Sequence, residues 1–144
     1  MGDISGKCLC EAVQYRICGS LGPIYNCHCS KCRRWHGAAF RTRASFKREQ
    51  FSWLSGADNL SSYASSDNVT RYFCSTCGSP LISTYKDHPD VLGIALGGLE
   101  GDISGRPQAH LFIDSKASWH QITDDLPQHS GWPGTESAVR KTVD

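Results

Sequence analysis

Short apolar stretches with a period of two residues dominate this chain. Between residues 12 and 17, Val13, Tyr15 and Ile17 alternate with polar neighbours, which is the pattern of a half-buried strand. Residues 38–46, 51–54, 60–63, 69–73, 81–85, 91–96 and 110–113 form further candidate strands. Gly, Ser, Asn, Asp or Pro separates them, and no segment keeps a helical period. The recurring short strands and turns predict an all-β sandwich or barrel.

One short helix is expected, at residues 30–36. Ser30 is placed as its N-cap, and Gly37 is placed to end it. Cys32 would then lie near the positive end of the helix dipole, which favours the thiolate form.

Chain length predicts one domain, because 144 residues suffice for a single core. From Pro127 onward the pattern becomes polar, so we predict a domain over residues 1–127 and a polar C-terminal arm, partly disordered, over 128–144. No apolar run approaches the roughly 18 residues of a membrane span. Because the N-terminus lacks a secretory signal, a cytoplasmic location is expected.

The eight cysteines indicate metal binding more than disulfides, because a reducing compartment is expected. Cys8 and Cys10 form one pair, and Cys74 and Cys77, which precede Gly78, form another. Together they supply the four thiolates of a closed structural zinc site. A redox pair at Cys74 and Cys77 is the alternative, but the βαβ context of such pairs is missing.

Cys27, Cys29 and Cys32 remain for a second metal. Three protein ligands leave the fourth position of a tetrahedral zinc open to water or substrate. Two alternatives stay open: Cys18, His28 or His36 closes this site, or the loop contributes to one shared cluster. Cys18 is more simply an ordinary buried cysteine.

Four motifs together resemble the family of glutathione-dependent formaldehyde-activating enzymes and centromere protein V. They are Gly-x-Cys-x-Cys, Cys-His-Cys-x-x-Cys-Arg-Arg-x-x-Gly, Phe-Cys-x-x-Cys-Gly-Ser-Pro-Leu and His-Leu-Phe-Ile-Asp-Ser-Lys-Ala-x-Trp. In this chain they occupy residues 6–10, 27–37, 73–81 and 110–119. The resemblance implies a mostly β single domain of several short coiled antiparallel β-sheets, related to the fold of the methionine-R-sulfoxide reductases and held together by zinc.

The resemblance also implies two Zn²⁺ ions, one structural on four cysteines and one catalytic on three. The activity that the resemblance implies is carbon-sulfur lyase chemistry on a glutathione adduct, with formaldehyde as the second substrate. Glutathione carries two carboxylates, which suit arginine as a bidentate partner. The candidates for this role are Arg33, Arg34, Arg41 and Arg43. The alternative is that these arginines neutralise anionic zinc centres or are solvated.

Attack of a zinc-bound thiolate on formaldehyde would give an alkoxide. The candidates to supply its proton are His28, His36 or a water. His110 is expected to be structural, and Trp35 and Phe40 are expected to pack in the core or wall the pocket. A non-catalytic thiol carrier and a structural zinc module for a macromolecular partner are the competing functions. The formal charge is +1, and seven thiolates with two dications would lower it by three, to −2. Binding to nucleic acid is therefore not expected, and the oligomeric state is left open.

Overall fold

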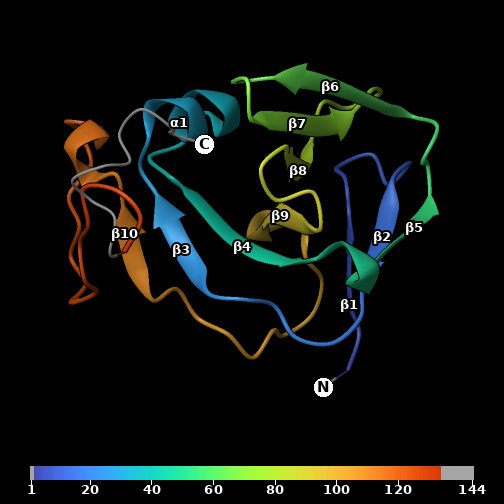
Figure 1. The fold of residues 1–144 in the computed structure, drawn as a ribbon, viewed down its shortest axis with the longest axis horizontal. Coiled ribbons are helices and arrows are strands. Elements are labelled where there is room, and N and C mark those ends of the chain that lie inside the picture. Colours follow the sequence, from blue (N-terminus) through green and yellow to red (C-terminus); the bar gives the residue numbers. More distant parts are fainter. Residues whose placement is uncertain (1, 134–144) are drawn as a thin grey trace.

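The computed structural model describes residues 2–133, where short strands dominate and one helix is present (Figure 1). The strands are β1 (Ile4–Lys7), β2 (Gln14–Ile17), β3 (Ile24–Cys27), β4 (Arg41–Lys47), β5 (Phe51–Ser55), β6 (Leu60–Ala64), β7 (Val69–Cys74), β8 (Pro80–Tyr85), β9 (Val91–Ala95) and β10 (Ala109–Leu111). The helix is α1 (Ser30–His36), and short 3₁₀ turns occupy Arg48–Gln50, Leu96–Gly98 and Ile113–Ser115. The predicted mostly β fold is confirmed. No helix in residues 2–133 is long and apolar enough to cross a membrane.

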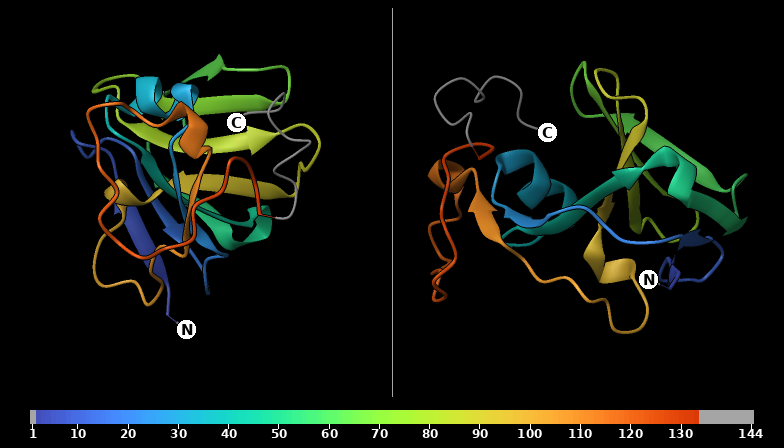
Figure 2. Two further views of the ribbon diagram at one scale, coloured as in Figure 1. Left: turned by 90° about the vertical axis from the view of Figure 1, so that its left-hand side faces the viewer. Right: turned by 60° about the horizontal axis from the view of Figure 1, so that its bottom comes forward.

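The strands form two sheets. The smaller has the order β1-β2-β5, and the larger has the order β10-β3-β4-β9-β8-β7-β6. All pairs are antiparallel except β10 and β3, which run parallel with Leu111 opposite Cys27. The expectation of purely antiparallel sheets was therefore incomplete. Residues 96–108 connect β9 to β10, which lies beyond β4 and β3 in the same sheet (Figures 1 and 2).

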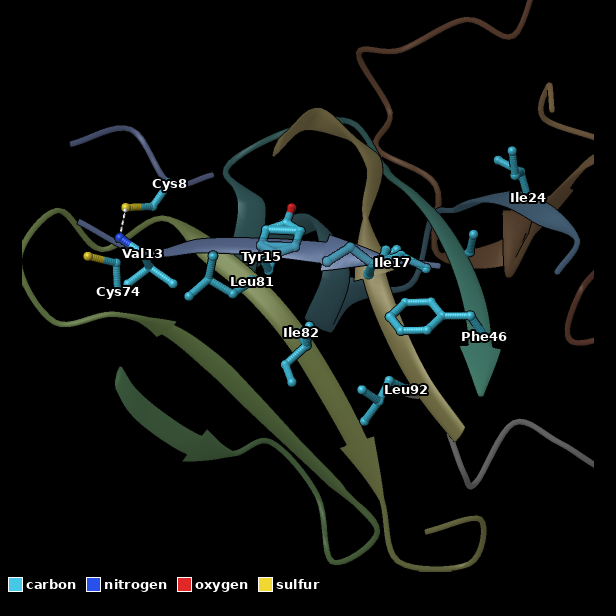
Figure 3. Close-up of a cluster of buried hydrophobic side chains, with 12 residues drawn as sticks. Cys8, Val13, Tyr15, Ile17, Ile24, Phe46, Cys74, Leu81, Ile82 and Leu92 are labelled. Carbon is cyan, nitrogen blue, oxygen red and sulfur yellow. Dashed lines mark hydrogen bonds between the residues drawn. The ribbon is translucent and has the colours of Figure 1, made fainter. Parts of the chain in front are cut away.

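The main core lies where side chains of both sheets meet (Figure 3). Val13, Tyr15 and Ile17 point inward from around β2 and are at most 1% exposed. Phe46 and Leu92 face them from the larger sheet. The period of two in the sequence thus places every second residue of β2 in this core.

A second, smaller cluster surrounds the three-cysteine loop. It lies with α1 and β10 at the opposite end of the molecule from the β1-β2-β5 sheet (Figure 1). Its members are Cys27, Cys29, Cys32, Leu111 and Phe112, with Tyr25 and Trp132 packed against them. Residues 128–133 therefore contact the domain. The rest of the predicted C-terminal arm, residues 134–144, lies outside the described residues.

The helix start differs from the prediction. Cys29 is the N-cap, and its sulfur accepts a hydrogen bond from the Cys32 backbone N–H at 3.3 Å. The assignment of Ser30 as N-cap is wrong because Ser30 is the first helical residue. The predicted stop at Gly37 is confirmed: its φ of 59° is left-handed, and its N–H bonds to the Arg33 carbonyl.

Candidate metal centres and the adjoining cleft

The four-cysteine cluster joins the two sheets. Cys8 and Cys10 come from the turn after β1, whereas Cys74 ends β7 and Cys77 lies in the turn between β7 and β8. All four sulfurs lie within 4.8 Å of one another. The Cys8–Cys10 and Cys10–Cys74 sulfur pairs are 3.6 and 3.8 Å apart. A tetrahedral zinc with Zn–S bonds of about 2.3 Å needs edges of about 3.8 Å, so these residues fit the ion.

Hydrogen bonds to the sulfurs favour their thiolate form. The Val13 N–H reaches the Cys8 sulfur at 3.3 Å, and the Cys77 N–H reaches the Cys74 sulfur at 3.5 Å. Gly78 has the positive φ expected of a zinc knuckle, 79°. Ser79 accepts the Leu9 N–H at 2.9 Å, which leaves its hydroxyl hydrogen for the Cys77 sulfur at 3.1 Å. That hydroxyl is the main reason why the pKa of Cys77 is lowered to about 5.

The three-cysteine cluster lies where β3 passes into α1. Cys27 ends β3, Cys29 caps the helix, and Cys32 lies in its first turn. Their sulfurs lie within 4.8 Å of one another, and all three residues are 0% exposed. Three soft sulfur ligands in this arrangement suit zinc. Within residues 2–133, no further His, Cys, Asp or Glu joins the group.

Among residues 2–133, the structure therefore does not support the alternatives in which Cys18, His28 or His36 closes the three-cysteine site. Cys18 is exposed and outside both clusters, so its interpretation as a buried cysteine is also wrong. It lies beyond the last inward residue of β2, where its backbone bonds to Gln50. The two cysteine groups are separate, so a single shared cluster is excluded as well.

Three arginines of the larger sheet are buried, and two of them, Arg41 and Arg71, lie close enough to Cys32 to lower its pKa. Arg41 and Arg43 were predicted from the sequence, and both are 3% exposed. Arg41 donates to the Ser83 hydroxyl at 3.3 Å, and Arg43 donates to the Tyr85 hydroxyl at 3.0 Å. The other two predicted arginines lie on α1. Arg33 donates to the Ser115 carbonyl at 3.0 Å, and Arg34 is exposed.

Arg71, on β7, was missed by the sequence reasoning. It is 1% exposed, and both terminal guanidinium nitrogens lie 3.9 Å from the Cys32 sulfur. Its Nε donates to the Ser65 hydroxyl at 2.9 Å. The sequence could have indicated this residue. Arg71 stands two residues after Val69 and two before Phe73, so in an alternating strand it shares a face with apolar residues.

The three thiols of the three-cysteine cluster differ in how readily they ionise. Hydrogen bonds from the Cys27 and Cys29 thiols, followed by the charges of Arg41 and Arg71, hold the pKa of Cys32 well below its usual value. The same sulfur network raises the pKa of Cys27, chiefly through Cys29. In the metal-free protein, Cys32 is thus the thiol that ionises first.

The two candidate histidines occupy different places. His28 turns away from the sulfurs, and its Nε2 lies 2.8 Å from His110 Nδ1. Burial, then the neighbouring His110, lowers the pKa of His28 to about 4. Burial, then the charge of Arg41, lowers the pKa of His36 to about 4. Both imidazoles are therefore neutral at pH 7.

A cleft of about 610 Å³ runs between the two cysteine clusters. His36, Phe40 and Arg41 line the end nearer the three-cysteine cluster, and Cys8 and Leu9 line the end nearer the other. Its volume falls in the range of small-molecule sites. Of the predicted wall residues, Phe40 lines the cleft, whereas Trp35 packs against Phe73 with ring centroids 5.5 Å apart.

Comparison with known proteins identifies relatives for most of the chain. Residues 3–115 match the family described as glutathione-dependent formaldehyde-activating enzyme. A protein provisionally named as such an enzyme in Halomonas elongata is 28% identical over 127 residues, covering 83% of this chain and 80% of the relative. An uncharacterized lyase of Schizosaccharomyces pombe is 33% identical over 85 residues, covering 59% of this chain.

The coverage of some relatives is partial. The chain spans 60% of the S. pombe lyase and 48% of a provisionally named formaldehyde-activating enzyme from Fusarium vanettenii, which is 33% identical over 61% of this chain. The crystal structure of a Rhodobacter sphaeroides protein aligns with a TM-score of 0.58 at 27% identity, covering 69% of this chain and 91% of that protein.

Proposed function

Because the chain belongs to the glutathione-dependent formaldehyde-activating enzyme family, we propose that it is a zinc-dependent carbon-sulfur lyase acting on glutathione and formaldehyde. The observation that carries the proposal is the three-cysteine cluster. Its sulfurs lie within 4.8 Å of one another, and no fourth His, Cys, Asp or Glu among residues 2–133 joins them. Such a donor set leaves one zinc position for an exogenous ligand.

Zinc held there would bind a small thiol as its thiolate, the form that attacks an aldehyde. The sulfur forms a bond to the carbonyl carbon, the carbon–oxygen π bond breaks, and the oxygen takes up the proton that the thiol has lost. The product is a hydroxymethyl thioether, and the reverse reaction cleaves the same carbon–sulfur bond. Most of the acceleration has to come from holding the two reactants in reacting geometry.

His36 is the residue best placed to move that proton. It lines the cleft, and its Nε2 is buried without a hydrogen-bond partner among the described residues. Its pKa of about 4 leaves the imidazole neutral and only weakly basic at pH 7, so His36 would relay the thiol proton to the alkoxide oxygen and would not hold it. His28 Nδ1 is also buried without a hydrogen-bond partner among the described residues, but His28 does not line the cleft and its Nε2 lies against His110.

The arginines supply positive charge for an anionic substrate. Arg41 lines the cleft and lies beside the three-cysteine cluster, so its guanidinium suits a substrate carboxylate. Arg33, Arg34 and Arg43 stay secondary candidates. The four-cysteine cluster takes a structural zinc that joins the sheets. A cytoplasmic location belongs to the same proposal, because seven ligand thiols have to stay reduced.

The experiment combines metal analysis with turnover. Wild-type protein is expected to bind two zinc ions, and Cys29→Ser one, whereas Cys18→Ser is the matched control because Cys18 lies outside both clusters. Formaldehyde loss in the presence of glutathione should exceed the protein-free rate for the wild type and Cys18→Ser only. One zinc in the wild type would refute the metal assignment. Two zinc ions with turnover equal to Cys29→Ser would leave a thiol carrier and refute the lyase.

A further inference from the structure

A line of hydrogen-bonded side chains runs from the surface to the three-cysteine loop. Asp124 is 47% exposed, and its Oδ2 and Oδ1 lie 3.0 and 3.2 Å from His110 Nε2. The other ring nitrogen of His110, Nδ1, lies 2.8 Å from His28 Nε2. His28 occupies the position between Cys27 and Cys29. The line therefore ends between two residues of the metal cluster.

The order of donors and acceptors along this line follows from its outer end. A carboxylate only accepts, so His110 Nε2 carries the hydrogen that Asp124 receives. The Nδ1 of a neutral His110 is then an acceptor, and His28 Nε2 must donate to it. The carboxylate at residue 124 thus fixes the tautomer of both imidazoles and the direction in which the His28 ring faces.

The inner part of the line is rigidly held. His28 is 0% exposed and His110 is 2% exposed. Phe40 packs on His28 with ring centroids 4.9 Å apart, and the His28 backbone N–H bonds to the Leu111 carbonyl at 2.9 Å. A buried network whose members are all oriented restricts the residues that it contacts. The ring of His28 cannot turn without losing its contacts with His110 and Phe40.

The outer end belongs to a late segment of the chain. The Leu126 N–H bonds to Asp124 Oδ1 at 3.0 Å, and the His110 N–H bonds to the Pro127 carbonyl at 2.8 Å. The carboxylate is therefore itself positioned against β10. This segment lies beyond the residues matched by the family, 3–115.

We propose that Asp124 and His110 are positioning residues for the three-cysteine metal site. They fix the side chain of His28, and through its backbone they fix the directions of the Cys27 and Cys29 sulfurs. Side chains on either side of His28 project from the same short backbone, so a turn of residue 28 moves both sulfurs. The inference rests on the proposed metal site at Cys27, Cys29 and Cys32.

The test measures zinc release from each cluster to a chromophoric chelator. In Asp124→Ala, release from the three-cysteine site is expected to be about tenfold faster, the lower end of the range for outer partners of metal sites. Release from the four-cysteine site should not change and serves as the internal reference. Asp125→Ala, at the exposed neighbouring position, is the matched control and should behave as wild type.

Conservative variants separate positioning from general stability. Asp124→Asn keeps an acceptor oxygen and His28→Gln keeps a donor near Nε2, so both should release zinc more slowly than Asp124→Ala and His28→Ala. The cobalt-substituted protein adds a spectroscopic readout, because the sulfur-to-cobalt absorption of the three-cysteine site alone should change in Asp124→Ala.

Three results would overturn the proposal: unchanged release in Asp124→Ala, equal acceleration at both sites with a lowered melting temperature, or no rescue by the conservative variants. Equal acceleration at both sites would mean that Asp124 only holds the segment around residues 124–127 on the domain. A wild-type protein with a single zinc would instead refute the proposed function, so the two failures are distinguishable.

Discussion

Replacing Arg71 by methionine is expected to weaken zinc binding at the three-cysteine cluster. Both terminal nitrogens of Arg71 lie 3.9 Å from the Cys32 sulfur. Two unit charges at that separation attract by about 4 kcal/mol at an effective dielectric constant of about 20. Because the buried guanidinium also loses hydration that methionine does not need, about half of that attraction is expected as the net effect, in line with about 1.5–3 kcal/mol for hydrogen bonds to charged groups.

A loss of about 2 kcal/mol corresponds to about 30-fold in zinc affinity. The assay is competition with a chelator of known affinity, which resolves the two clusters as separate transitions. The four-cysteine transition is the internal control. Arg71→Lys keeps the charge but not the paired nitrogens, so its affinity should fall between those of Arg71→Met and the wild type.

The same substitution has a consequence for pH. Arg71 is one of the charges that lower the pKa of Cys32, so Arg71→Met raises that pKa and makes zinc compete with a more tightly held proton. Zinc release on acidification should therefore begin at higher pH than in the wild type. An Arg71→Met protein with wild-type affinity and wild-type pH dependence at this cluster would show that the guanidinium does not stabilise the thiolate.

Two further predictions concern the other cluster and the late segment. Ser79→Ala removes the hydroxyl that holds the pKa of Cys77 near 5, so the pH at which the four-cysteine zinc is half released should rise, and an unchanged midpoint in a pH titration would contradict this reasoning. Trp132→Ala removes ring contacts to Tyr25 and Phe112 and is expected to lower unfolding stability in urea by about 2 kcal/mol, whereas Trp119→Ala, at a 72% exposed position, should stay within about 0.5 kcal/mol. Equal effects of the two tryptophan variants would mean that residues 128–133 do not stabilise the domain.

Sequence patterns predicted the features that depend on local spacing. Alternation identified β2, and the spacing of Cys27, Cys29 and Cys32 identified the three-cysteine cluster, because ligands on one short loop need no knowledge of the fold. The four-cysteine cluster was predicted by adding two distant cysteine pairs to the ligand number of a closed zinc site. Two strands, β1 and β3, were missed because they do not alternate between apolar and polar residues. β1 contains Gly6 and one apolar residue, and β3 has three buried residues in four, so neither shows a period of two.

The contacts that connect distant segments were not predictable in this way. Arg71 meets Cys32 across 39 residues, and His110 meets His28 across 82. Nothing in the local pattern around these residues names the partner. The sequence reasoning took His110 as structural, and the structure adds that it connects Asp124 to the residue between two metal-cluster cysteines. The centromere protein V part of the resemblance and the absence of nucleic-acid binding stay predictions.

The two cysteine clusters also differ in when they can form during synthesis of the chain. Cys27, Cys29 and Cys32 lie within six residues, so closing their loop costs little entropy. Cys10 and Cys74 are 64 residues apart, and closing that loop costs about 2 kcal/mol more. On a ribosome, the three-cysteine loop emerges complete before Cys74 has been added. Metal loading therefore has a built-in order, in which the local site is available first and the site that joins the sheets closes the fold last.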